Sequence, residues 1–183
     1  MNMIEAMNNS GSISLQNYLN YIKDGLIMEF GVATGNTINR LARNAKGRTV
    51  YGFDSFQGLP ENWRPEFGAG SFKQDKLPWV EANVKLVVGL FVDTLPIFLQ
   101  EHTDPVAFIH IDCDLYSSTK CVFDNLKDRM QDGTIIAFDE IRSYQGFEQH
   151  EYKAFNEFLE ETKYQWECIG NHGGEQAGFR IYK

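Results

Sequence analysis

The stretch Leu26-Ile27-Met28-Glu29-Phe30-Gly31-Val32-Ala33-Thr34-Gly35-Asn36-Thr37 sets the architecture that we expect of the whole chain. It begins as an apolar run that ends in a carboxylate and a glycine, and small residues and a second glycine then lead into a helical pattern. This order predicts a buried strand, a tight turn and a helix. Glycine lets a backbone approach a ligand closely, and the first turn of a helix offers unpaired N–H groups. We therefore expect a nucleotide-type strand–turn–helix unit.

Glu29, at the tip of the predicted strand, narrows the choice of ligand. A carboxylate there repels the pyrophosphate that a helix N-terminus attracts, but it attracts an ammonium group. Gly31 and Gly35 are spaced G-x-x-x-G, so the G-x-G-x-x-G fingerprint of dinucleotide-binding proteins is absent. A cationic nucleotide that carries an amino acid, such as S-adenosylmethionine (SAM), fits this pattern better than NAD.

The composition is that of a single globular domain over residues 1–183, with 43% hydrophobic and 23% charged residues. A formal charge of −8 argues against nucleic acid or an anionic membrane surface as the main partner, because both require a basic surface. The cysteines form no C-x-x-C pair, so neither a disulfide framework nor a zinc site is indicated. Because no signal-peptide pattern and no membrane-length apolar run is present, we expect a cytoplasmic protein.

Strand patterns alternate with helical patterns along the chain, which predicts a mostly parallel sheet with helices on both faces. Residues 1–11 are expected to be frayed. Strands are expected at residues 26–30, 49–53, 83–88, 106–111, 134–138, 164–169 and 178–182, and helices at 15–22, 38–45, shortly after 93, at 117–130 and at 152–159. The last two strands are too close for a crossover helix, so the last strand should be antiparallel. The expected fold is a seven-stranded, Rossmann-like α/β sheet with ligands at the carboxyl ends of its parallel strands.

Residues 57–80 interrupt this alternation. The segment is rich in proline and glycine and also contains Trp63, Phe67, Phe72 and Trp79. A connection of this length in a compact domain is usually functional, disordered or hiding a short helix, and large aromatic side chains argue against disorder. We expect a long loop over the ligand site with one helix near residues 73–82. A purely structural flap is the alternative.

Acidic residues recur where the parallel strands end. Asp54 follows the second strand, where it could accept hydrogen bonds from ribose hydroxyls or cap a turn. Asp112 and Asp139 lie at the ends of two strands that one right-handed crossover joins. These strands should therefore be neighbours about 4.8 Å apart. Glu140 adds a third carboxylate, and a divalent cation would stabilise such a group. Oxygen-only ligands indicate Mg²⁺, Ca²⁺ or Mn²⁺, whereas the alternative is that Asp139 and Glu140 cap the next segment.

His110 lies two residues before Asp112 and so on the same side of the strand. It could act as a base near neutral pH, and the alternative is a satisfied core histidine. Asp114 is a less favoured metal ligand, because it lies beyond the strand and could cap the next helix. No spacing that suggests metal binding is found for His102, His150 and His172.

Several motifs together resemble the class I SAM-dependent methyltransferases, and specifically the macrocin O-methyltransferase family of natural-product enzymes. The matching stretches are residues 29–35 (EFGVATG), 54–60 (DSFQGLP), 89–96 (GLFVDTLP), 111–119 (IDCDLYSST) and 138–140 (FDE). The resemblance implies a SAM site that includes Glu29, Gly31, Thr34, Gly35, Thr37, Asp54, Ser55, Phe56, Gly89, Leu90 and Phe91. It also implies that Asp112, Asp139 and Glu140 bind Mg²⁺.

The sequence departs from the family pattern at two of these positions. Cys113 stands where the family has glycine between the two acids, and Glu140 stands where the family has aspartate. We also do not expect the N-terminal extension that helps to close the site in the family. The identity of the substrate therefore does not carry over.

We expect a Mg²⁺-assisted O-methyltransferase that acts on a hydroxyl of a small molecule, such as a sugar or a phenol. The metal would lower the pKa of the hydroxyl, Asp112 or His110 would take its proton, and the oxygen would attack the sulfonium methyl in line. The alternatives are a metal-independent methyltransferase, a noncatalytic SAM-binding module and, less favoured, an NAD oxidoreductase. The sequence leaves the acceptor and the oligomeric state open, with a homodimer as one alternative.

Overall fold

A computed structural model describes residues 1–183 and contains one seven-stranded sheet with the strand order β3-β2-β1-β4-β5-β7-β6. The strands are β1 (Leu26–Phe30), β2 (Val50–Asp54), β3 (Val84–Val88), β4 (Val106–Ile111), β5 (Met130–Phe138), β6 (Gln165–Gly170) and β7 (Ala177–Tyr182). The first five run parallel, and β7 runs antiparallel to both of its neighbours. The central strands β1 and β4 are buried at every residue, which explains their almost unbroken apolar sequences.

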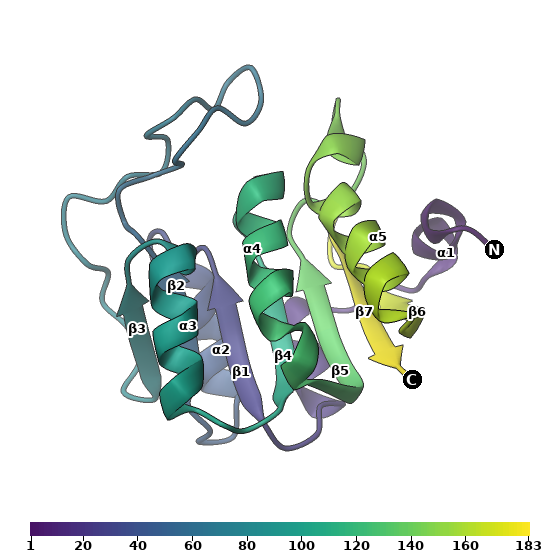
Figure 1. Cartoon of the computed structure of the whole chain (residues 1–183), viewed down its shortest axis with the longest axis horizontal. Helices are drawn as coiled ribbons and strands as arrows, with labels where there is room; N and C mark the ends of the chain where they lie inside the picture. Colours follow the sequence, from purple (N-terminus) through teal and green to yellow (C-terminus); the bar gives the residue numbers. More distant parts are fainter.

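Helices cover both faces of the sheet (Figure 1). The helices are α1 (Met3–Asn9), α2 (Asn36–Asn44), α3 (Phe91–Glu101), α4 (Tyr116–Leu126) and α5 (Glu151–Thr162), with 3-10 turns η1 (Leu15–Asn20), η2 (Lys127–Arg129) and η3 (Phe147–Gln149). The larger of two apolar core clusters joins α3, α4 and α5 to one face, and the smaller joins α2 and η1 to the other. All of these helices fall short of the length and hydrophobicity needed to span a bilayer.

The expected strands all form, with bounds that differ by a few residues, but two sequence-based expectations are wrong. The segment expected to fray contains α1, which has a capping box between Asn2 and Glu5 and buries Met3 and Met7. This apolar contact with the region of β6 is a tertiary interaction that a short polar sequence does not reveal. No helix forms at residues 73–82, where turns and coil surround Pro78.

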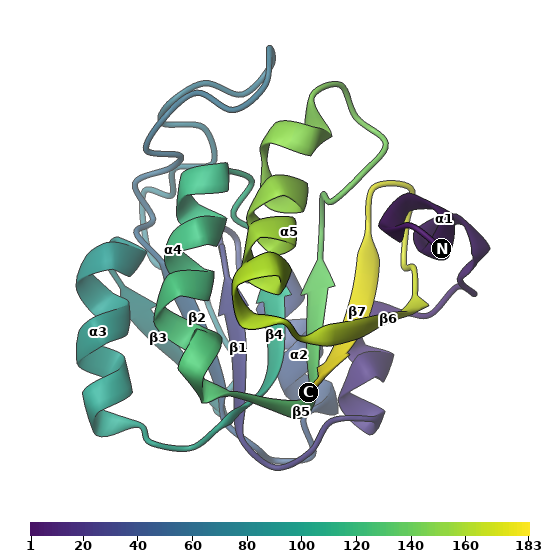
Figure 2. The same cartoon turned by 45° about the vertical axis from the view of Figure 1, so that its right-hand side comes forward.

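Residues 57–80 form a long connection between β2 and β3, without a helix or a strand of its own. It rises beyond the carboxyl ends of the parallel strands, as does the connection between β5 and α5 (Figures 1 and 2). The connection is bonded to itself, because the backbone N–H of Leu59 donates to the carbonyl of Ser71 at 2.9 Å and the N–H of Gly70 to the carbonyl of Leu59 at 2.8 Å. This self-pairing gives the loop a definite shape beside the strand ends.

Candidate functional site

The ends of the parallel strands meet at one rim of the sheet. The backbone N–H of Gly31 donates to the carbonyl of Phe53, the last but one residue of β2, at 2.9 Å. The N–H of Asp112 donates to the carbonyl of Phe30 at 2.9 Å, and that of Asp139 donates to the last carbonyl of β4 at 2.9 Å. These bonds continue the parallel ladder past the strands. Acids that are far apart in the sequence therefore lie side by side.

The carboxylate of Asp54 shapes the glycine turn. Its Oδ2 accepts the backbone N–H groups of Val32 and Ala33, both at 2.8 Å, and its Oδ1 accepts the N–H of Phe56 at 2.7 Å. The turn passes through positive φ at Gly31 (92°) and at Ala33 (44°). Hydrogen bonds to an ionised group are stronger than neutral ones, so Asp54 holds this unusual backbone in place. Asp54 therefore supports the turn, and its carboxylate stays the candidate partner for a ribose hydroxyl.

A cavity of about 660 Å³ opens at this rim, within the size range of small-molecule sites. Its wall contains six of the residues expected to contact SAM: Gly31, Asp54, Ser55, Gly89, Leu90 and Phe91. The three expected metal ligands, Asp112, Asp139 and Glu140, also line it. Leu59, Pro60 and Phe72 bring the loop of residues 57–80 into the same wall.

The other residues expected at the site lie outside this wall. Thr34 is exposed on the outer side of the glycine turn, and Thr37 is half-buried in the first turn of α2. Gly35 is the N-cap of α2, where a Cβ would come within 3.1 Å of Pro78. Phe56 is buried in the smaller apolar cluster, and its backbone rather than its ring serves the turn.

Glu29 and His110 form a fully buried pair beneath the cavity. They are direct partners in the register of β1 and β4, and His110 Nδ1 lies 3.1 Å from Glu29 Oε2. Burial raises the pKa of Glu29, and the hydrogen bond to His110 partly opposes this. Because neither side chain lines the cavity, the structure does not place His110 against a substrate or Glu29 against an ammonium group.

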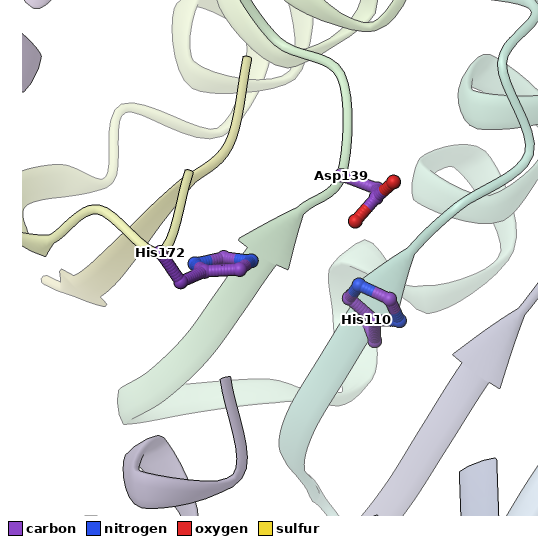
Figure 3. A group of neighbouring side chains, drawn as sticks. All are labelled: His110, Asp139 and His172. Atoms are coloured by element: carbon purple, nitrogen blue, oxygen red, sulfur yellow. The ribbon is translucent and has the colours of Figure 1, made fainter. Parts of the chain in front are cut away.

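The group of carboxylates that could hold a metal ion differs by one residue from the expected one. One carboxylate oxygen from each of Asp112, Asp114 and Glu140 lies within 4.8 Å of the others. Glu140 joins this cluster, whereas Asp139 offers a carboxylate oxygen within 4.8 Å of ligand atoms of His110 and His172 (Figure 3). Asp114 takes its place because a φ of 66° turns the chain back after β4.

Burial and mutual repulsion make the acid cluster (Asp112, Asp114 and Glu140) electrostatically costly without a cation. Burial, followed by the charge of Asp139, raises the pKa of Glu140 to about 10. Burial raises the pKa of Asp114 to about 7, and it raises that of Asp112 well above its ordinary value with Asp139 as the next cause. Glu140 Oε2 is buried without a hydrogen-bond partner. These features suit a site for a divalent cation with oxygen ligands.

Sequence reasoning made Asp114 the less favoured ligand, whereas the structure places it beside Asp112 and Glu140. It also missed several other residues of this region. Ser117, Ser118 and Cys121 line the cavity because α4 begins at the rim, and its start was expected within one residue. The buried Glu151 accepts a hydrogen bond from the N–H of Asp114 at 3.3 Å. His172 gave no signal, because no sequence spacing relates the loop after β6 to the end of β4.

Comparison with known proteins decides the class of this fold. The model of a protein family described as a methyltransferase domain matches residues 28–141, which is more than half of the chain. The chain belongs to this methyltransferase family. The matched residues run from β1 to just beyond β5 and therefore include the glycine turn, Asp54 and all three residues of the acid cluster. The protein is a class I SAM-dependent methyltransferase.

Solved structures share the fold of this methyltransferase. A calicheamicin methyltransferase, CalS11, aligns with a TM-score of 0.71 and 24% identity over 90% of this chain and 74% of its own. The O-methyltransferase NovP aligns with a TM-score of 0.66 and 20% identity over 92% of this chain and 78% of its own. MycE from the mycinamycin biosynthetic pathway, solved with Mg and SAH, aligns with a TM-score of 0.60 and 13% identity over 92% of this chain and 47% of its own. No curated protein matches the chain.

Proposed function

We propose that this methyltransferase transfers the methyl group of SAM to a hydroxyl oxygen of a small molecule, of the sugar or phenol type, with the assistance of Mg²⁺. The observation that carries the proposal is the position of the acid cluster, which lines the same cavity as the glycine turn. A hydroxyl acceptor needs help to lose its proton near neutral pH, and a cation beside the methyl donor supplies that help. MycE, which shares this fold, was solved with Mg and SAH together, and this supports the combination.

The residues present fit SAM. Gly31 lines the cavity, where the backbone of the turn would meet the ligand. Asp54 lines the cavity, and a carboxylate offers about four acceptor positions, so it can accept one ribose hydroxyl in addition to its three N–H partners. Ser55, Leu90 and Phe91 would hold the adenosine side. Glu29 would act through its charge, which burial leaves weakly screened, rather than through a hydrogen bond.

The residues present also fit Mg²⁺. The acid cluster offers only carboxylate oxygens, which Mg²⁺ prefers, and one of them is buried without a partner. We assign Asp112, Asp114 and Glu140 as ligands and place Asp139 beside them as a fourth negative charge on the cavity wall. When bound, Mg²⁺ would lower the pKa of the acceptor hydroxyl as a Lewis acid.

The other steps of the proposed reaction fall to different side chains of the cavity. Asp112 lines the cavity and can receive the proton of the acceptor hydroxyl, whereas His110 is enclosed and can only support its neighbours. Leu59, Pro60 and Phe72 cover the outer wall, where they would exclude water and orient the acceptor. Holding donor and acceptor in line supplies much of the rate in such a transfer.

The proposal is tested by measuring SAM binding by calorimetry and methyl transfer to a panel of sugars, phenols and amines by mass spectrometry. We expect SAM to bind, NADH not to bind, and product to form only with hydroxyl acceptors. Treatment with EDTA should abolish turnover, and added Mg²⁺ should restore it. Full turnover in EDTA would establish a metal-independent methyltransferase instead. SAM binding without transfer to any acceptor would leave a noncatalytic SAM-binding module.

Two variants sharpen this test. Asp114→Asn removes one proposed ligand and should raise the Mg²⁺ concentration needed for half-maximal activity by more than tenfold. Asp128→Asn changes an exposed acid that has no hydrogen bond and should leave the Mg²⁺ dependence unchanged. An equal Mg²⁺ dependence in Asp114→Asn and the unchanged protein would remove Asp114 from the metal site.

A further inference from the structure

A second group of metal-ligating side chains lies beside the cavity. His110, Asp139 and His172 each offer one ligand atom, and these atoms all lie within 4.8 Å of one another. Figure 3 shows both imidazole rings and the carboxylate pointing toward one another from the end of β4, the end of β5 and the loop after β6. Neither histidine lines the cavity, so the proposed methyl transfer uses only Asp139 of this group, as a charge on the cavity wall.

His110 presents a free nitrogen to this group. Its Nδ1 is occupied by Glu29 at 3.1 Å, and its Nε2 is fully buried without any hydrogen-bond partner. Because Nδ1 already has Glu29 as its partner, Nε2 is the nitrogen that His110 can offer to this group. A carboxylate behind the distal nitrogen is the usual arrangement for a histidine that binds a metal, because it fixes the tautomer and the ring orientation.

His172 is held in one tautomer by Tyr18. The Tyr18 hydroxyl donates its only hydrogen to the carbonyl of Gly170 at 3.0 Å, so it must accept from His172 Nδ1, 3.3 Å away. The Nε2 of His172 then carries a lone pair, and it is buried without a partner.

The three groups therefore present acceptors to one another. Asp139 contributes a carboxylate whose Oδ1 already accepts the side-chain amide of Gln176. A water molecule carries two hydrogens, so a single water at the centre would leave one acceptor unsatisfied, and unsatisfied buried acceptors are costly. A cation satisfies all three at once.

We propose that His110, Asp139 and His172 bind a divalent transition-metal ion of the Zn²⁺ type, separately from the Mg²⁺ of the acid cluster. Two imidazoles and one carboxylate are a donor set that suits Zn²⁺ and similar transition-metal ions, whereas the all-oxygen acid cluster suits Mg²⁺. The ion would join the ends of β4 and β5 to the loop after β6. It would thereby fix that loop and hold Asp139 on the cavity wall.

The test uses purified full-length protein that has been stripped with a chelator and returned to a buffer containing excess Mg²⁺, which occupies the acid cluster. Zn²⁺ is then titrated by equilibrium dialysis, and Co²⁺ is titrated by its visible absorption. We expect one tightly bound Zn²⁺ per chain, a Co²⁺ spectrum of nitrogen and oxygen ligation, and a higher melting temperature with Zn²⁺. Circular dichroism without metal shows that each variant is folded.

Matched variants separate the two metal sites. His172→Gln should weaken Zn²⁺ binding by more than about 100-fold, beyond the effect of a lost outer partner. Tyr18→Phe keeps the metal ligands but removes the outer partner of His172, together with the hydrogen bond to the Gly170 carbonyl, and should weaken Zn²⁺ binding by about 10- to 100-fold. Asp114→Asn should keep the Zn²⁺ site. Failure of the unchanged protein to bind Zn²⁺ in excess Mg²⁺, or equal binding by His172→Gln, would overturn the proposal, and SAM binding measured on the same samples reports on the methyltransferase function independently.

Discussion

Gly31 and Asp112 approach so closely that position 31 has no room for a side chain. A Cβ on Gly31 would overlap the carbonyl oxygen of Asp112 and lie 2.6 Å from its carbonyl carbon. Both partners are backbone atoms held by the ladder bonds between β1, β2 and β4, so neither can move aside alone. The turn that faces the proposed methyl donor is thus tied to the strand end that carries the first acid of the metal cluster.

Replacing Gly31 by alanine should destabilise the protein by at least about 2 kcal/mol and abolish SAM binding, because it combines backbone strain with this overlap. Gly47→Ala is the matched control, since Gly47 has a similar positive φ of 81° but nothing within 4 Å of its added Cβ. It should cost only about 1 kcal/mol, from backbone strain, and should leave SAM binding intact. Urea denaturation and calorimetry measure both effects, and equal losses in the two variants would contradict the role of the overlap.

Asp54→Asn should weaken SAM binding by more than tenfold and cost about 2 kcal/mol of stability, because the amide can no longer accept hydrogen bonds on both sides. The N–H groups of Val32, Ala33 and Phe56 all point at the present carboxylate. Asp128→Asn serves as the control for a change of one charge on the surface. If Asp54→Asn bound SAM as tightly as the unchanged protein, the carboxylate would be neither a ribose ligand nor the support of the turn.

The sequence allowed most of the fold and the rim of the site to be predicted, because both depend on local patterns. Apolar runs predicted the strands, and the rule of right-handed crossovers predicted that β4 and β5 are neighbours. Asp112 and Asp139 were therefore expected at the same edge of the sheet. The exchange of Asp139 for Asp114 in the acid cluster could not be foreseen. It depends on a left-handed φ at Asp114 and on which side of the chain Asp139 faces, and neither is written in residue spacing.

The enclosure of Glu29 and the position of His172 also lay beyond the sequence. Glu29 is enclosed beside its cross-strand partner His110. This pairing depends on the register between β1 and β4, which lie far apart in the sequence. His172 reaches the same place from a loop whose path is fixed by tertiary contacts with Tyr18. Long-range register and loop path are the information that a single sequence does not carry.

The metal-free protein should lose stability as the pH rises. Burial raises the pKa of Glu140 from its ordinary 4.5 to about 10, so the folded chain holds this proton more tightly than the unfolded chain. The stability that protonated Glu140 contributes is therefore fully present below about pH 4.5 and declines as the pH rises toward 10. Thermal melts in EDTA across this range should show the decline, and Glu140→Gln should make it shallower. Saturating Mg²⁺ should remove most of it, and a Mg²⁺-independent slope would argue against a cation at this cluster.

Docking of α1 can be tested by truncating one buried side chain and one exposed side chain. Met7 is fully buried in the larger apolar cluster, so Met7→Ala should destabilise the protein by about 2–5 kcal/mol. Ile97 is 61% exposed, and Ile97→Ala should have little effect on stability. Urea denaturation followed by tryptophan fluorescence gives both values. A negligible effect of Met7→Ala would mean that the first residues are frayed in solution, as the sequence suggested.

Arg64 joins the loop of residues 57–80 to the connection after β5 and to the loop between β6 and β7. Its guanidinium lies 4.0 Å from the ring centre of Trp63 and 5.0 Å from that of Tyr144, and it forms an ion pair of 3.3 Å with Glu175. An ion pair at a half-exposed position contributes little to global stability, and the cation–π contacts add about 1 kcal/mol. The main effect of Arg64→Ala should therefore be a loosened loop.

We expect Arg64→Ala to raise the KM for the acceptor by roughly tenfold, equivalent to about 1.4 kcal/mol, while SAM affinity stays within a factor of two. The acceptor side is more sensitive because the loop supplies Leu59, Pro60 and Phe72 to the cavity wall. Limited proteolysis should also cut residues 57–80 faster. Arg43→Ala, which breaks the exposed 2.7 Å ion pair with Glu81 away from this loop contact, is the control. If both variants changed the acceptor KM equally, the effect would come from surface charge rather than from the attachment of the loop.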